Sequence, residues 1–164
     1  NVRDLGDVAL LFVGEGSEKS RLVAASRELS LNNVLFAPAL PEMEFEALLR
    51  ECTAGLISLD ARLRSHNIPG KLLSYLKMGL PVIASINAGN DLAEILRQSG
   101  AGTAVLNGDD NALAAAVKAV CLEPEQRRRM GAQAEELGRR QFSSKRAASQ
   151  ILAACDSVRS RAQA

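Results

Sequence analysis

Short, uniformly apolar runs alternate with segments of helical period along this chain of 164 residues. The first run, Val8 to Val13, ends at two glycines, and similar runs recur at 34–37, 54–59, 81–84 and 103–105. A run without polar alternation is typical of a strand buried on both faces, as in parallel sheets covered by helices. The alternation therefore predicts an α/β fold, a Rossmann-like doubly wound parallel sheet with helices on both faces.

The last part of the chain has a different character. Residues 123–164 hold nine basic and five acidic side chains and no strand-like run. Two helices are predicted there, at 124–140 and 144–157, as a helical C-terminal tail that packs on the larger body. The arginines at 127–129 and 139–140 are expected on a solvated helix face, with contact to a membrane surface or partner domain as the alternative.

Composition excludes several classes of function. The net charge of +1 and the 3% aromatic content argue against nucleic-acid binding. A single histidine and three widely spaced cysteines argue against a metal site and favour a reducing, cytoplasmic compartment. No apolar run approaches the roughly 20 residues that span a bilayer. The chain begins at Asn1 without an initiator methionine, so a processed form or an excised piece of a longer protein is expected.

In an open parallel sheet, ligands bind outside the carboxyl ends of the strands, and the turn at Gly14 and Gly16 follows the first predicted strand. Glycines there let backbone approach a phosphate or ribose closely, although a tight strand-to-helix turn needs small residues too. Lys19 stands where a dinucleotide fingerprint has its third glycine. Ser17 is expected to cap the following helix, and Asp110 a later one.

The loop from Asp60 to Lys71 is the strongest candidate site. Pro69 at a first helical turn should leave the amides of Gly70, Lys71 and Leu72 free, and Lys71 adds a positive charge. Together they predict a diphosphate cradle; the alternative is a well-made helix start with an exposed lysine. His66, with Ser65 and Asp60, also permits a hydrolase interpretation, but no nucleophile elbow accompanies it.

A third polar segment, residues 85–91, follows the fourth predicted strand and could close over a ligand, although ordinary loop tips have the same composition.

The run from Ile68 to Ala84, IPGKLLSYLKMGLPVIA, resembles the donor-binding half of GT-B glycosyltransferases of the retaining group 1 (family 4) class. Bacterial members that build lipopolysaccharide, O-antigen or capsule sugars are particularly similar. The VGEGS turn, the FAPALP segment, the AGLISL strand and the terminal helices fall in the same order, so the resemblance covers nearly the whole chain.

The resemblance implies a nucleotide-sugar-binding domain at 1–122, with helices at 123–164 packed on it. Gly14 and Gly16 would line the donor cleft, and the backbone around Phe36, Ala37 and Leu40 would face the nucleobase. The amides around Pro69, Gly70 and Lys71 would meet the diphosphate, with Lys71 as charge partner of the leaving group. No metal and no cofactor beyond the nucleoside diphosphate sugar is implied.

Two departures from the family pattern bear on activity. Family members commonly carry two glutamates eight positions apart, and His66 and Ser74 occupy those positions here. Ser74 could still donate one hydrogen bond to the ribose, and His66 could approach the sugar or a phosphate. The first strand and helix of the donor domain and the whole N-terminal acceptor domain are expected to be missing, which predicts a fragment without transferase activity of its own.

In the parent enzyme, the resemblance implies hexosyl transfer to a growing, lipid-linked glycan at the inner face of the plasma membrane. Three alternatives remain. A degenerate, non-catalytic nucleotide-sugar-binding homologue would explain His66 and Ser74. A dinucleotide-binding oxidoreductase domain would need a third glycine and a ribose-binding carboxylate. A receiver domain would use Asp60 after its third strand, but lacks the acidic cluster after the first.

Overall fold

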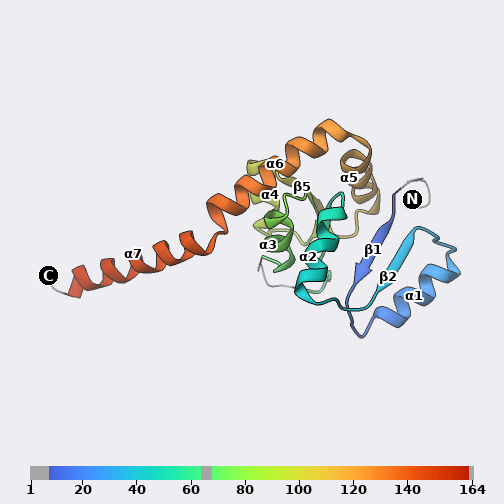
Figure 1. Cartoon of the computed structure of the whole chain (residues 1–164), viewed down its shortest axis with the longest axis horizontal. Coiled ribbons are helices and arrows are strands. Elements are labelled where there is room, and N and C mark those ends of the chain that lie inside the picture. Colours follow the sequence, from blue (N-terminus) through green and yellow to red (C-terminus); the bar gives the residue numbers. More distant parts are fainter. Residues whose placement is uncertain (1–7, 64–67, 163–164) are drawn as a thin grey trace.

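The computed structural model describes residues 8–63 and 68–162. Strands and helices alternate up to the fifth strand, and three helices follow (Figure 1). The strands are β1 (Leu10–Val13), β2 (Val34–Ala37), β3 (Gly55–Ser58), β4 (Val82–Ile86) and β5 (Gly102–Leu106). The helices are α1 (Lys19–Glu28), α2 (Glu42–Glu51), α3 (Lys71–Lys77), α4 (Leu92–Ser99), α5 (Asp110–Leu122), α6 (Pro124–Gln141) and α7 (Ser144–Ala162).

All strand pairings are parallel, so the predicted Rossmann-like α/β class with a helical C-terminal segment is confirmed. The strands nevertheless divide into two hydrogen-bonded sheets instead of one. One has the order β1-β2, with Phe12 opposite Phe36, and the other has the order β3-β4-β5, with Ala84 between Ile57 and Ala104. Parallel strands place their following loops along one edge of each sheet.

The hydrophobic core lies around the three-stranded sheet. Every residue of its central strand β4 is buried, which explains the uninterrupted apolar run in the sequence. A larger cluster packs β3 and β4 against α3, α4 and α6, and a smaller one packs Ile83 against α5 and Met130 of α6. Glycines make close contacts here, because a Cβ at Gly55 would lie 2.3 Å from the Tyr75 ring.

The helix ends agree with the sequence patterns in part. Gly100 ends α4 with φ of 69°, a left-handed conformation that suits glycine, as predicted. The two predicted caps are wrong by one residue. Glu18, not Ser17, precedes α1 and makes no capping bond, whereas Asp109, not Asp110, caps α5 by accepting from the Ala112 amide at 2.9 Å. In each case the helix begins where the preceding turn ends, which the local sequence leaves undetermined.

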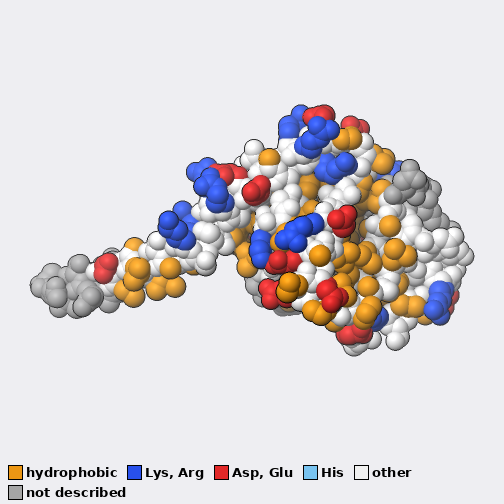
Figure 2. All heavy atoms as spheres, in the orientation of Figure 1, with side chains coloured by type: hydrophobic (Ala, Val, Ile, Leu, Met, Phe, Trp, Pro, Cys, Tyr) orange, Lys and Arg blue, Asp and Glu red, His pale blue; other side chains and the backbone are white. Residues whose placement is uncertain are grey.

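The two tail helices occur as predicted but behave differently. Helix α6 packs across α3, where a Cβ at Gly138 would lie 3.1 Å from the Leu76 Cβ. Helix α7 extends away from the body as a long projection (Figures 1 and 2), leaving Ile151 and Leu152 64% and 66% exposed. Within the described parts of the chain, no helix is both long and apolar enough to cross a membrane.

Candidate functional site

The turn after β1 is tied to the end of β2 by one lysine. The Lys19 ammonium donates to the Gly14 carbonyl at 3.1 Å, to the Ala37 carbonyl at 3.3 Å and to the Glu15 carboxylate at 2.8 Å. The Gly14 amide also donates to the Ala37 carbonyl, at 3.2 Å. The structure therefore brings together Gly14, Gly16 and Ala37, three of the residues predicted to bind the donor.

Glu15 is held in the same turn. The hydrogen bond and charge of Lys19, together with a backbone hydrogen bond from Ala39, hold the pKa of its carboxyl below the usual range. Sequence reasoning treated Lys19 only as a missing glycine. The sequence does contain a signal for this role, because Lys19 follows Gly14 by five residues. At that spacing a lysine in the first turn of a helix can reach back to the carbonyls at the strand ends.

Phe36 and Leu40 are half-buried beside this turn. The Phe36 ring stacks on Phe12 with centroids 5.3 Å apart. A cavity of about 720 Å³ lies between α1 and β2 and includes Phe36 and Lys19 in its lining. An aromatic face next to a polar turn is suited to contact with a planar ring.

A second group of polar contacts forms at the carboxyl ends of the three-stranded sheet. The side-chain Nδ2 of Asn107, after β5, donates to the Leu59 carbonyl at 2.5 Å and to the Asn87 side-chain oxygen at 3.1 Å. Asn87 in turn donates to the carbonyls of Asp60 and Leu63, at 2.9 and 2.7 Å. Two asparagines therefore hold the start of the long loop that follows β3.

Asp60 is already engaged in this loop. The Arg62 guanidinium donates to both of its carboxylate oxygens, and the Arg62 amide donates to one of them at 2.8 Å. These bonds hold the pKa of Asp60 well below its usual range, so it is ionised at neutral pH. The predicted residue His66, together with residues 64, 65 and 67, lies outside the described residues.

The start of α3 differs from the prediction at one amide. The Leu72 amide donates to the Pro69 carbonyl at 3.0 Å and is not free, because the first turn closes on itself. Pro69 has no N–H, so the amides of Gly70 and Lys71 remain as donors within the described part of this turn. Lys71 is exposed and Ser74 is half-buried on the same helix.

The glycines fall into two kinds. A Cβ at Gly102 would lie 2.1 Å from the Val82 carbonyl oxygen, and one at Gly131 2.7 Å from the Gly79 carbonyl oxygen, so packing requires these glycines. A Cβ at Gly16 or Gly70 would meet nothing within 4 Å, and neither has a positive φ. Among the described residues, packing and backbone conformation therefore give no reason for glycine at these two positions, which both lie beyond the carboxyl ends of strands.

The structure does not link the two groups of contacts. Among the described residues, no hydrogen bond or ion pair joins the turn at 14–19 to the loop at 59–63 or to the start of α3. The described residues, 8–63 and 68–162, contain no group of three or more His, Cys, Asp or Glu side chains that could hold a metal ion.

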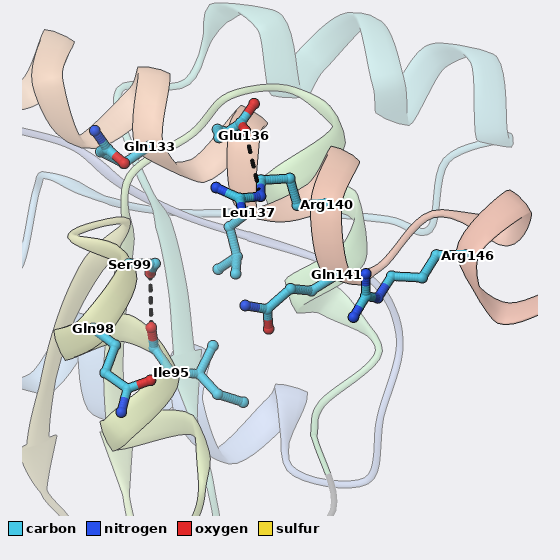
Figure 3. Close-up of a pocket in the computed structure, with 9 residues that line it drawn as sticks. All are labelled: Ile95, Gln98, Ser99, Gln133, Glu136, Leu137, Arg140, Gln141 and Arg146. Carbon is cyan, nitrogen blue, oxygen red and sulfur yellow. Dashed lines mark hydrogen bonds and ion pairs between the residues drawn. The ribbon is translucent and has the colours of Figure 1, made fainter. Parts of the chain in front are cut away.

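A separate cavity of about 380 Å³ lies between α4, α6 and the start of α7 (Figure 3). Arg140 and Arg146 extend beside it, and Ile95 and Leu137 supply apolar side chains. The Glu136 carboxylate forms an ion pair with the Arg140 guanidinium, with Oε1 and Nε 3.7 Å apart. None of the predicted donor-binding residues lines this cavity.

Comparison with known proteins identifies related folds. The family model "Glycosyl transferases group 1" matches residues 1–122. The Anabaena protein HepE in complex with UDP superposes with a TM-score of 0.75 and 18% identity, covering 92% of this chain and 41% of its own. The glycosyltransferase WaaG, involved in lipopolysaccharide biosynthesis, superposes with a TM-score of 0.65 and 16% identity, covering 85% and 38%.

Sucrose-phosphate synthase from Thermosynechococcus elongatus superposes with a TM-score of 0.71 and 22% identity, covering 93% of this chain and 39% of its own. At these identities the likeness establishes the fold. The chain spans about two fifths of the length of each of these structures. No curated protein sequence matches it.

Proposed function

The chain belongs to the group 1 glycosyl transferases, and from that premise we propose that it is the donor-binding part of a glycosyltransferase. The donor is a nucleoside diphosphate sugar. Structures of HepE with UDP and with UDP-glucose share this fold, and the latter covers 95% of this chain with a TM-score of 0.69. Their ligands support the choice of donor class.

One observation carries the proposal. Gly16 follows β1, and Gly70 immediately precedes α3, so both lie at the edge where ligands bind in open parallel sheets. Among the described residues, neither glycine is required by packing or by its φ. Glycine at such a position lets the backbone approach a ligand more closely than any side chain allows. The two glycines therefore mark the surfaces that contact the donor.

Roles for the remaining residues follow from this arrangement. The amides of Gly70 and Lys71 donate to the diphosphate, and the exposed Lys71 ammonium neutralises charge as the diphosphate departs. Ser74 donates one hydrogen bond to the ribose. His66 acts beside the sugar or a phosphate. Catalysis then rests on orientation and on stabilising the leaving group, with retention at the sugar carbon.

Phe36, Ala37 and Leu40 form the nucleobase side of the donor site, and Gly14 continues its wall. Lys19 supports this side by tying the turn after β1 to the end of β2. The nucleobase would then lie against half-buried aromatic and aliphatic side chains, while the diphosphate meets amides and a cation. That division of polarity suits a nucleoside diphosphate.

The acceptor requires a second domain, which we place outside this chain. The exposed residues Ile151 and Leu152 of α7 would pack on that domain. We propose hexosyl transfer to a growing surface glycan, such as lipopolysaccharide or O-antigen, by a cytoplasmic protein at the inner face of the bacterial plasma membrane. The likeness to WaaG supports this choice of glycan. Alone, this chain should bind the donor without transferring it.

The experiment separates binding from folding by substituting glycines of the two kinds. Gly16→Ala and Gly70→Ala should leave the urea unfolding midpoint unchanged or slightly higher and weaken UDP binding about 10-fold or more, measured by calorimetric titration. Gly131→Ala is the matched control. Its Cβ would lie 2.7 Å from the Gly79 carbonyl oxygen, so it should lower the midpoint and leave the UDP affinity of the folded protein unchanged.

Lys71→Ala should weaken the same binding and change stability by less than about 0.5 kcal/mol. Titrations with GDP, ADP and NAD beside UDP identify the base. Binding of NAD alone would favour the dinucleotide-binding oxidoreductase alternative. Equal UDP affinity in the Gly16→Ala, Gly70→Ala and wild-type proteins would contradict the site.

A further inference from the structure

The cavity between α4, α6 and the start of α7 lies at the other end of the strands from the proposed donor site. Its lining on α4 consists of Ile95, Gln98 and Ser99, in the last part of that helix. Helix α4 begins after the carboxyl end of β4 and ends just before β5 begins. The cavity is therefore near the amino ends of the strands, whereas Gly16 and Gly70 lie beyond the carboxyl ends. A ligand held here would not occupy the donor site.

The floor of the cavity is apolar and well anchored. Leu137 is 4% exposed and belongs to the main hydrophobic cluster, and Ile95 packs against that cluster. Figure 3 shows the Leu137 side chain extending from α6 toward α4. Phe142, directly after α6, packs on the same cluster, and its amide donates to the Gly138 carbonyl at 3.1 Å. The junction of α6 and α7 is therefore fixed to the body of the molecule.

The interruption between α6 and α7 brings two arginines to one cavity. Arg140 lies in the last turn of α6 and Arg146 in the first turn of α7. In an uninterrupted helix, residues six positions apart point about 120° apart around the axis. Here the helix breaks at Phe142 and Ser143, and the Ser143 hydroxyl accepts from the Arg146 amide at 3.3 Å. Two guanidinium groups, which repel one another, therefore line the same space.

The carboxylate in the lining does not neutralise these two arginines. Glu136 is bound by Arg139, whose Nε and Nη2 donate to its carboxylate oxygens at 2.9 and 2.8 Å. The Arg140 Nε is 3.7 Å from Glu136 Oε1, which is beyond hydrogen-bond distance. Among the described residues, no carboxylate forms an ion pair with Arg146. Once Arg139 has neutralised Glu136, the charges of Arg140 and Arg146 remain.

The remaining polar lining and the size of the cavity indicate a ligand with an organic body. Gln133 and Gln141 line the cavity, and neither makes a side-chain hydrogen bond to another described residue. Their amides can therefore donate to a ligand. The volume of about 380 Å³ lies within the roughly 300–1,000 Å³ of small-molecule sites. Space therefore remains over Ile95 and Leu137 when an anionic group lies between the arginines.

We propose that this cavity binds a small organic phosphate monoester. At neutral pH such an ester carries about two negative charges, which matches the two arginines that have no close carboxylate. The planar guanidinium groups of Arg140 and Arg146 donate to the phosphate oxygens, and the organic body lies on Ile95 and Leu137. A carboxylate supplies only one charge and fits less well. The proposal does not depend on the proposed function, because the donor site uses other residues.

The test is a titration of the isotope-labelled chain with phenyl phosphate, followed through its amide chemical shifts. Phenyl phosphate combines a dianion with an apolar ring. The amides of Gln98, Gln141 and Arg146 should shift in a saturable way. At constant ionic strength, phenyl phosphate should bind at least about 10-fold more tightly than inorganic phosphate or benzoate, because neither supplies both the ring and two charges.

Charge-matched variants locate the phosphate. Arg146→Gln and Arg140→Gln should each weaken phenyl phosphate binding at least about 10-fold, with little change in the unfolding midpoint, because both side chains are exposed. Arg128→Gln is the matched control. It removes the same charge from α6, but Arg128 pairs with Glu125 at 3.1 Å and does not line the cavity. The control should bind phenyl phosphate as tightly as the wild type does.

Several results would overturn the proposal. Phenyl phosphate could cause no saturable shifts, or benzoate could bind as tightly as it does. Equal affinity in the Arg146→Gln, Arg140→Gln and Arg128→Gln variants would show that the arginines of the cavity do not hold the phosphate. Shifts centred on Gly16 and Gly70 would assign the probe to the donor site. UDP is titrated separately, so its failure to shift those two glycines, with phenyl phosphate binding intact, would count only against the proposed function.

Discussion

The amino-terminal unit, defined as β1, α1 and β2, and the carboxyl-terminal unit, defined as β3 to α6, repeat the same strand and helix pattern with opposite results. Helix α4 buries Leu92 and Leu96 completely, whereas α1 buries none of its residues. Both helices follow a short parallel strand, but the apolar stripe of α4 is stronger than that of α1. Helix α4 also packs on β4, β5 and α6, whereas α1 has no comparable packing against any described element.

This contrast shows that periodic sequence patterns specify elements but not their burial. Burying a leucine side chain fully contributes about 1.5–3 kcal/mol. The carboxyl-terminal unit collects many such contributions around β4, and the amino-terminal unit collects only partial ones. Global unfolding should therefore be governed by the three-stranded sheet, and the amino-terminal unit should open first.

The largest expected difference comes from matched leucine truncations. Leu76 is 1% exposed under α6, and Leu76→Ala should lower the free energy of unfolding by about 3 kcal/mol through lost burial and a cavity. Leu35 is 50% exposed, and Leu35→Ala should cost less than about 1 kcal/mol. Urea unfolding followed by circular dichroism measures both. Equal losses would show that the two units have equivalent cores.

The hydrogen bonds at the strand ends of the two units should differ less in their contribution to stability than the two leucines do. Asn107→Ala removes the bonds to the Leu59 carbonyl and the Asn87 side chain, and should cost about 1–2 kcal/mol. Lys19→Met removes three bonds from a side chain that is 29% exposed, so solvent replaces part of the loss, and less than about 1 kcal/mol is expected. The same urea titration ranks the two variants. A greater loss for Lys19→Met would place the stronger tie in the amino-terminal unit.

The only tyrosine of the chain reports on the carboxyl-terminal unit alone. Burial is the main cause that raises the pKa of Tyr75 above the usual value of 10.0, and the Cys52 charge adds to it. Its hydroxyl donates to the Leu56 carbonyl of β3 at 3.2 Å. Tyrosinate absorbance should therefore appear at higher pH in the folded chain than in urea.

The effect on stability follows from that direction. Because the folded pKa is raised, the contribution of Tyr75 is fully present below pH 10.0 and is lost as the pH rises through the folded value. Tyr75→Phe should remove this alkaline loss and cost about 1 kcal/mol at neutral pH for the hydroxyl bond. Identical titrations with and without urea would show that the ring is not buried in solution.

Most elements of this fold could be predicted from the sequence, because an apolar run or a helical stripe is a local property. The central strand β4 is the clearest case, since all five of its residues are buried. The division into two sheets could not be predicted, because strand pairing depends on which strands lie side by side in the folded chain. Helix caps at Glu18 and Asp109 were missed by one residue for a related reason, since turn geometry decides them.

The candidate site was predictable to a similar extent. Glycine-rich turns after strands are local signals, and they identified Gly16 and Gly70, whose open surroundings only the structure shows. The ties made by Lys19 and Asn107 span 18 and 48 residues and depend on tertiary structure. The sequence predicts a free Leu72 amide, whereas the structure has it bound to Pro69, because the pattern for a helix start does not distinguish a closed first turn from an open one.

The smallest effect is expected at the ion pair between Glu46 of α2 and Lys77 of α3, which links the helix after the amino-terminal unit to the carboxyl-terminal unit. The hydrogen bond from Lys77 is the main cause that lowers the pKa of Glu46 below the usual value of 4.5, with burial opposing it. The contribution of this pair is therefore present above pH 4.5 and lost as the pH falls through the folded value.

Lys77→Met should lower the unfolding midpoint only slightly at neutral pH, because the lysine is 62% exposed and solvent screens the pair. The difference from wild type should vanish in acid and in high salt. Glu46→Gln is the matched control and should match Lys77→Met. Since Leu49 anchors α2 in the core, amide exchange of α2 should follow that of α3 in both variants. If α2 instead exchanged together with β1 and β2, the boundary between the two units would lie after α2, and the ion pair would be the contact that holds them together.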